Sequence, residues 1–240
     1  MMKQRVSVWG MVLVALLLVP RLEAGPLEEA IRLYEQGVRE YDTGTLERAL
    51  RTARGRRGRK EYVHYLCEGL ILHRLQMVCF INGGTRQSKR WGEEAERVLR
   101  QAEQSSPDSI EPVTYRGLVY LYLAMCGGRA GSRYGINAKR VSTVCIKAFP
   151  DHPLSRILDG AVALELPRAL GGDPVKAVSV FTALRMKYAD LEDVRVYLGK
   201  AYLMAGQAEQ AFAVLKSVLQ RNPLNRHAAR VLNDVLAAMK

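Results

Sequence analysis

The sequence predicts an all-α protein in which antiparallel helix pairs stack into a solenoid. After Gly25, apolar residues recur at spacings of three and four, which is typical of amphipathic helices. That part of the chain contains no run of alternating apolar and polar residues, which would indicate a strand. It also lacks the Asn-Gly and Asp-Gly turns that indicate β-hairpins. The chain has 240 residues, 48% of them hydrophobic, so it can bury a core without disulfides or metals.

Eleven helices are expected between the breaks that glycine and proline impose. The predicted ranges are 27–43, 45–54, 61–81, 87–104, 109–126, 135–148, 153–168, 173–187, 191–205, 208–221 and 225–239. The breaks are Gly44, Gly83-Gly84, Ser105-Ser106-Pro107, Gly127-Gly128, Pro150, Gly171-Gly172, Gly206 and Asn222-Pro223. Short connections favour antiparallel neighbours. The last helix has an apolar side and should cap the open end of the stack.

Residues 1–24 are typical of a secretory signal peptide. Lys3 and Arg5 form a basic start, and an apolar run follows from 6 to 20. Ala24 is a small residue directly before Gly25, where cleavage is expected. The run is shorter than the roughly 20 residues of a membrane-spanning helix. We therefore expect export to the periplasm with cleavage after Ala24. The alternative is an uncleaved segment that anchors the chain in the inner membrane.

An internal repeat is clearest over residues 192–225. Gly199 and Ala211 leave room for two helices to approach closely, and Pro223 ends the second helix. A related segment around residue 172 pairs a Gly-Gly turn with Asp173 as the helix cap. The packing residues predicted for the two segments are Gly171, Gly172, Asp173, Ala177, Phe181, Leu198, Gly199, Tyr202, Ala211 and Pro223. Weaker repeats are expected around 27–60, 61–107, 109–153 and 154–189, with residues 25–240 forming one solenoid.

These residues resemble the tetratricopeptide repeat, a helix pair of about 34 residues. The segment 166–181 and the Gly-rich connection 127–131 are similar to the periplasmic T component of TRAP transporters. That resemblance implies a non-catalytic adaptor without cofactors, which pairs with a periplasmic substrate-binding protein. The alternative is a general periplasmic scaffold for envelope assembly. Whether the chain forms homo-oligomers is left open by the sequence.

Tetratricopeptide proteins turn one face of their helices to ligands, and helical spacing selects candidates for that face. In the best repeat they are Val196, Lys200, Leu203 and Met204. Around the middle pair they are Arg116, Tyr120 and Arg133. The alternative for each of these residues is ordinary core or solvated surface.

Catalytic and metal-binding patterns are absent from the sequence. His64 and His73 lie too far apart on one predicted helix to share a metal ion. There is neither a nucleophile elbow nor a phosphate-binding loop, so we expect no enzyme and no metal site. Cys126 and Cys145 lie on consecutive helices, where they can form a disulfide or remain buried thiols.

A basic segment stands out in a chain whose formal charge is +12. Its cations are Arg51, Arg54, Arg56, Arg57, Arg59 and Lys60. Nucleic acid is not the expected partner, because no aromatic residues are interleaved and the chain is expected to be exported. The remaining alternatives are a solvated loop and a binding site for polyanions, an acidic partner or an anionic membrane surface.

Overall fold

The computed structural model describes residues 26–55, 62–128 and 130–240. Within these ranges the chain forms α-helices and one 3₁₀-helix and contains no strand, which confirms the all-α prediction. The elements are α2 (Pro26–Glu40), α3 (Thr43–Arg54), α4 (Tyr62–Ile81), α5 (Thr85–Ser105), α6 (Ile110–Met125), α7 (Gly131–Ala148), α8 (Pro153–Glu165), η1 (Arg168–Leu170), α9 (Pro174–Lys187), α10 (Glu192–Met204), α11 (Ala208–Arg221) and α12 (Arg226–Ala238).

The helices follow the predicted ranges with three main differences. Helix α2 ends at Glu40 and α3 begins at Thr43, so the predicted break at Gly44 is wrong. The break lies at Tyr41, whose φ is 53°, and at Asp42, which caps α3. Helix α7 begins at Gly131 rather than at residue 135, and α8 ends at Glu165 before the short η1 turn. Beyond η1, Gly171 has a left-handed backbone with φ of 93°. Asp173 then caps α9, because its carboxylate accepts a hydrogen bond from the backbone amide of Lys176 at 3.0 Å.

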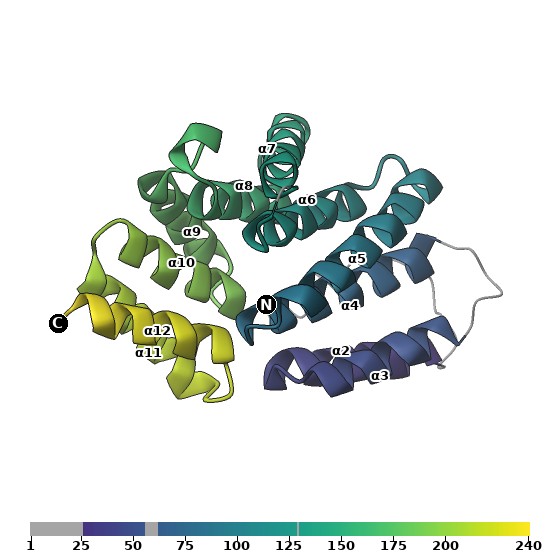
Figure 1. Ribbon diagram of the computed structural model, residues 1–240, viewed down its shortest axis with the longest axis horizontal. Coiled ribbons are helices and arrows are strands. Elements are labelled where there is room, and N and C mark those ends of the chain that lie inside the picture. The colour runs from purple at the N-terminus through teal and green to yellow at the C-terminus, as the bar shows by residue number, and fades with distance from the viewer. Residues whose placement is uncertain (1–25, 56–61, 129) are drawn as a thin grey trace, which may run out of the picture.

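In the part of the chain that the structure describes, consecutive helices pack as five pairs, α2 with α3, α4 with α5, α6 with α7, α8 with α9 and α10 with α11. The pairs follow one another along an arc that runs from the purple α2 and α3 to the yellow α12 (Figure 1). Helix α12 packs on α11 and buries Val231 and Val235 there, as expected of a cap. Leu236 on the same helix remains exposed, and so does Met239, which directly follows the end of the helix.

One contact recurs in the helix pairs: a glycine of a first helix faces a bulky side chain. A Cβ atom on Gly199 would lie 2.6 Å from Cγ of Leu215, which is fully buried. The equivalent contacts are Gly37 with Leu46, Gly69 with Leu99, Gly117 with Val141 and Leu158, and Gly160 with Phe181. Each second helix adds at least one fully buried alanine, and those on the packing unit are Ala49, Ala95, Ala138, Ala177 and Ala211. The five pairs are therefore versions of one packing unit.

The C-terminal end of the arc returns to its N-terminal helices. Asn222 Nδ2 donates to the carbonyl oxygen of Arg39 at 3.3 Å, and Arg230 Nη1 donates to that of Ile81 at 3.0 Å. The solenoid is therefore curved into an almost closed ring. Among the helices of the described ranges, none combines the length and hydropathy needed to cross a membrane.

We expect Gly199→Ala to lower the free energy of unfolding by about 1–2 kcal/mol, because overpacking against Leu215 exceeds the gain in helix propensity. Denaturant unfolding measures the change. Gly44→Ala is the control, since a Cβ there would approach nothing closer than 3.6 Å. Equal stability of the two variants would contradict the packing argument.

Candidate functional site

A cavity of about 460 Å³ lies on the inner side of the arc. Helices α2, α4, α6, α8 and α10, the first helix of every pair, contribute to its walls, together with the end of α11. The apolar part of the lining includes Ile31, Val38, Met77, Leu118, Ile157 and Val218. Because each repeat supplies part of the wall, the cavity exists only when the whole stack is folded.

An ion pair between α4 and α10 contributes to the wall of this cavity. Arg74 Nη2 lies 2.8 Å from Asp193 Oδ2, although the two residues are 119 positions apart. The Arg74 side chain retains 14% of its exposure, and its Nε atom has no hydrogen-bond partner in the described part of the chain. Burial alone would raise the pKa of Asp193, but the attraction and hydrogen bond of Arg74 outweigh it and lower that pKa.

His73, Tyr115 and Tyr197 are among the residues that line the cavity beside the ion pair, whereas Tyr122 packs against His73 outside the lining. His73 is buried, with its ring centroid 5.8 Å from that of Tyr115 and 5.9 Å from that of Tyr122. The hydroxyl groups of Tyr122 and Tyr197 are hydrogen-bonded at 3.2 Å. Burial lowers the pKa of His73 to about 3, so its imidazole is neutral at pH 7. Its Nδ1 atom has no partner among the described residues.

Charges of both signs surround these apolar and aromatic walls. Glu35, Arg39, Asp190, Glu192, Arg195 and Arg221 belong to the lining. Burial lowers the pKa of Arg195, and the neighbouring Arg221 and Arg185 lower it further. Apolar walls with a few oriented polar groups are typical of binding sites. In the described ranges, no group of three His, Cys, Asp or Glu residues is placed to hold a metal ion.

The residues predicted on the inner face of the best repeat do not line this cavity. Val196 is fully buried in the cluster formed by α10, α11 and α12, so its expected exposure to ligands is wrong. Lys200 Nζ pairs with Glu165 at 2.6 Å, Leu203 packs beside the α12 cluster, and Met204 is exposed. Helix α10 instead lines the cavity with its first turns, because α11 and α12 cover the side on which Val196 lies.

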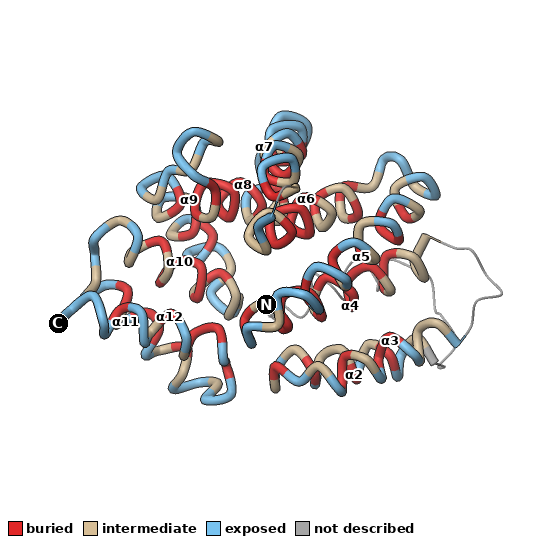
Figure 2. Tube along the Cα trace, viewed as in Figure 1, coloured by how far each residue is buried: buried red, intermediate tan, exposed pale blue. Residues whose placement is uncertain are grey.

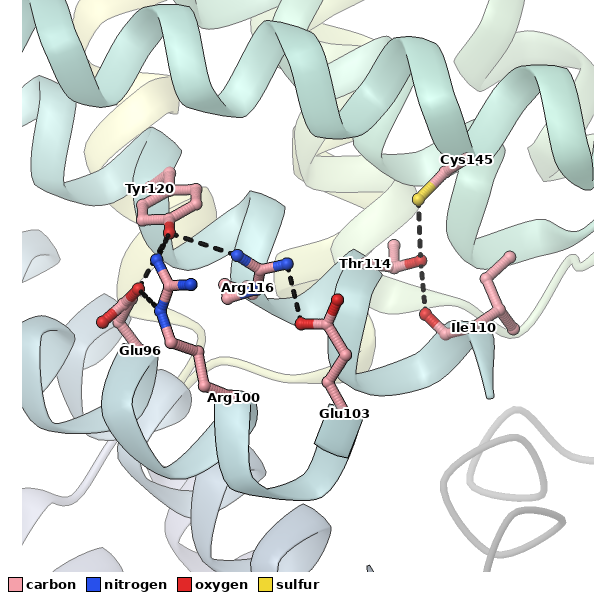
Figure 3. Close-up of polar contacts among 8 residues, drawn as sticks. All are labelled: Glu96, Arg100, Glu103, Ile110, Thr114, Arg116, Tyr120 and Cys145. Carbon is pink, nitrogen blue, oxygen red and sulfur yellow. Dashed lines mark hydrogen bonds and ion pairs between the residues drawn. The ribbon is translucent and has the colours of Figure 1, made fainter. Parts of the chain in front are cut away.

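Two of the three candidates in the middle pair belong to a polar network between α5 and α6 (Figure 3). Arg116 pairs with Glu103 at 2.7 Å and donates to the hydroxyl of Tyr120 at 3.3 Å. That hydroxyl donates to Glu96 at 2.8 Å and accepts a hydrogen bond from Arg100. Arg133, the third candidate, is exposed on α7. The network joins two repeats and lies outside the cavity lining.

The described part of the basic segment includes only two of the predicted cations. Arg51 is exposed, whereas Arg54 pairs with Glu68 at 2.7 Å and with Glu94 at 2.6 Å. The other four, Arg56, Arg57, Arg59 and Lys60, lie outside the described residues.

The two cysteines considered for a disulfide are free thiols in the structure. The thiol of Cys126 donates to the hydroxyl of Ser88 at 3.5 Å. The Sγ atom of Cys145 lies 3.6 Å from the hydroxyl of Thr114 (Figure 3).

Arg74, His73 and Asp193 were not among the binding-site residues predicted from the sequence. A signal was present, because Arg74 lies in the middle of a helix that is otherwise largely apolar. A lone cation in such a helix must find a partner when the helix is buried. The partner lies six helices later in the chain, and no local spacing reveals it.

We expect the protein to lose stability as the pH falls from 6.5 towards 4. Burial lowers the pKa of His73 to about 3 and that of His227 to about 4, so in this window only the unfolded chain protonates them. Unfolding then takes up protons, at about 1.4 kcal/mol per pH unit for each histidine. Denaturant unfolding at several pH values measures this slope, and His73→Gln should reduce it. An unchanged slope in this variant would contradict the conclusion that His73 takes up a proton on unfolding.

Arg74→Met should lower the free energy of unfolding by about 2–3 kcal/mol, less than for a fully buried pair because the Asp193 side chain is 38% exposed. The double variant Arg74→Met with Asp193→Leu should lose less free energy of unfolding than Arg74→Met alone, since no unpaired charge remains. Thermal and denaturant unfolding measure both. Lys89→Met is the control, because its pair with Glu93 is exposed on both sides. A loss as large in the control would show that the ion pair has no special role.

The fold and part of the sequence are similar to those of known proteins. Residues 170–235 match the family model of the tetratricopeptide repeat. The crystal structure of TTC0263, a thermophilic TPR protein of Thermus thermophilus, aligns with a TM-score of 0.54 and 19% sequence identity over 88% of this chain and 97% of that chain. A tetratricopeptide repeat protein of Parabacteroides merdae gives a TM-score of 0.40 and 13% identity over 89% and 93% of the two chains.

No curated protein matches the chain. The matched stretch covers α9, α10 and α11 and most of α12, which includes the best repeat predicted from the sequence. The comparisons thus support the tetratricopeptide resemblance and do not reach the narrower T-component group. Residues 170–235 are therefore similar to the tetratricopeptide repeat, and the chain as a whole has the fold of a tetratricopeptide repeat protein.

Proposed function

We propose that this chain is a non-catalytic adaptor that receives a segment of a partner protein in the inner cavity. The tetratricopeptide fold suggests a protein-interaction scaffold. The observation that carries the proposal is the cavity itself, whose walls come from the first helix of all five pairs. A segment bound there contacts every repeat at once, so binding and the closed form of the ring stabilise each other.

The lining indicates the chemistry of the bound segment. A volume of about 460 Å³ lies within the range of about 300–1,000 Å³ that is typical of ligand sites. Apolar side chains of the partner would fill the space between Ile31 and Ile157. Arg74 Nε is an unused donor for a backbone carbonyl or a carboxylate of the segment. The surrounding charges of both signs would select among partners rather than attract one sign of charge.

We propose further that the adaptor is exported and pairs with the substrate-binding subunit of a TRAP-type transporter. Support for export comes from the basic, apolar and small-residue pattern of residues 1–24. Support for this partner comes from the resemblance of segment 166–181 to the T component. A general scaffold for envelope assembly is the competing assignment. A polyanion-binding function of residues 51–60 gains no support from Arg54, whose guanidinium is held by two carboxylates.

Tagged protein should recover a periplasmic substrate-binding protein from native envelope extract, in competition with untagged protein. Ile31→Glu with Ile157→Glu should abolish recovery, because two carboxylates would be placed in the apolar wall. Val175→Glu is the matched control, since Val175 is 71% exposed on α9 and lies outside the cavity. Mass spectrometry identifies the partners, and circular dichroism checks that each variant is folded.

Three outcomes would change the assignment. Recovery of envelope-assembly factors alone would replace the transporter partner with a scaffold function. Retention of the partner by the double variant would exclude the cavity as the binding site. Failure to detect the protein in the periplasmic or membrane fraction would contradict export.

A further inference from the structure

Helix α7 presents exposed apolar side chains at the edge of the molecule. Ile136 and Val144 are 55% and 57% exposed, and Phe149, directly after the helix, is 44% exposed. Figure 2 shows the outer turns of α7 as exposed along one side. The opposite side of α7 is buried, through Gly131, Gly135, Ala138, Val141, Ser142 and Cys145. Burial of that side explains how α7 is held, but it leaves the exposed apolar residues without a structural role.

Cations surround these apolar side chains. Arg133, Arg140 and Lys147 are exposed on α7. At 100° per residue they fall on the same side of the helix as Ile136 and Val144. No acidic residue occurs anywhere from 112 to 150 in the sequence. We call the surface formed by Arg133, Ile136, Arg140, Val144 and Lys147 the α7 face.

The α7 face continues onto the neighbouring 3₁₀-helix. Lys139 reaches η1, where its Nζ atom would lie 3.0 Å from a Cβ on Gly171. Arg168 is exposed on η1 itself, and residues 166–172 contain no carboxylate. The basic border therefore extends beyond one helix.

We propose that the α7 face docks on an anionic lipid surface. A helix that surrounds exposed apolar side chains with Lys and Arg is suited to a membrane interface, where the cations meet lipid phosphates and the apolar groups reach the acyl boundary. A second copy of the chain fits less well, because a symmetric contact through this face would oppose like charges. The proposal does not depend on the partner of the inner cavity.

Docking through α7 would also orient the ring. In Figure 1, α7 lies at the edge opposite α2, α3, α11 and α12. With α7 on the lipid surface, these four helices point away from it. A partner that reaches the cavity between the two ends of the arc would then approach from the aqueous side.

Vesicle co-sedimentation tests the proposal, with the chain in the form that its native host produces. We expect binding to vesicles of phosphatidylglycerol and phosphatidylcholine in equal parts, and none to phosphatidylcholine alone. Arg133→Gln with Arg140→Gln should weaken binding about twenty-five-fold, because each cation near an anionic surface contributes about fivefold. Arg86→Gln with Arg90→Gln on α5 has the same net charge and should leave binding unchanged.

A second pair of variants tests the apolar contribution. Ile136→Ser with Val144→Ser should weaken binding, whereas Leu236→Ser with Met239→Ser, which alters exposed residues at the C-terminal end, should not. All four side chains are exposed, so the variants are expected to keep the wild-type melting temperature. Absence of vesicle binding, or equal losses in the α7 and control variants, would overturn the proposal. Cross-linking from residue 140 in the envelope provides a second check. Capture of an acidic envelope protein alone, without lipid, would also overturn the proposal.

Discussion

The architecture depends on the close approach of a glycine in one helix to a bulky side chain in a neighbouring helix. At Gly199 and Leu215 the separation leaves no space for even a methyl group. Because glycine has no side chain, the two helix backbones come closer together than two full side chains would allow. Because the contact recurs at Gly37, Gly69, Gly117 and Gly160, the pairs stack with similar geometry, and the repeated step between them produces a curved solenoid.

Curvature in turn creates the inner cavity and brings distant residues together. The first helices of the pairs line the inside of the arc, so Arg74 of α4 reaches Asp193 of α10. Polar contacts of Asn222 and Arg230 with α2 and α4 join the two ends of the arc. These contacts involve exposed or half-buried groups and a few hydrogen bonds. The junction between the ends is therefore the part of the ring held by the weakest interactions, and the packed helix pairs are the strongest.

Much of the helical organisation was predictable, and the reason is local. Apolar spacing, Gly-Gly turns and caps such as Asp173 act within one or two turns of helix, so the eleven ranges follow from nearby residues. The repeat was visible where Gly199 precedes Ala211 by twelve residues, as Gly37 precedes Ala49. From Gly69 to Ala95 the connection is much longer. There the longer helices α4 and α5 conceal the same packing unit from a search at fixed spacing.

The sequence by itself determined the fold class, the pairing of consecutive helices and the identity of the best repeat. Only the tertiary structure decided which residues face the cavity. Val196 and Tyr197 are neighbours on α10, yet Val196 packs under α11 and α12 whereas Tyr197 lines the cavity. The physical reason is that periodicity defines the apolar faces of a helix without identifying the neighbour that covers each one. That neighbour depends on the direction in which the pairs stack, which is a property of the whole chain.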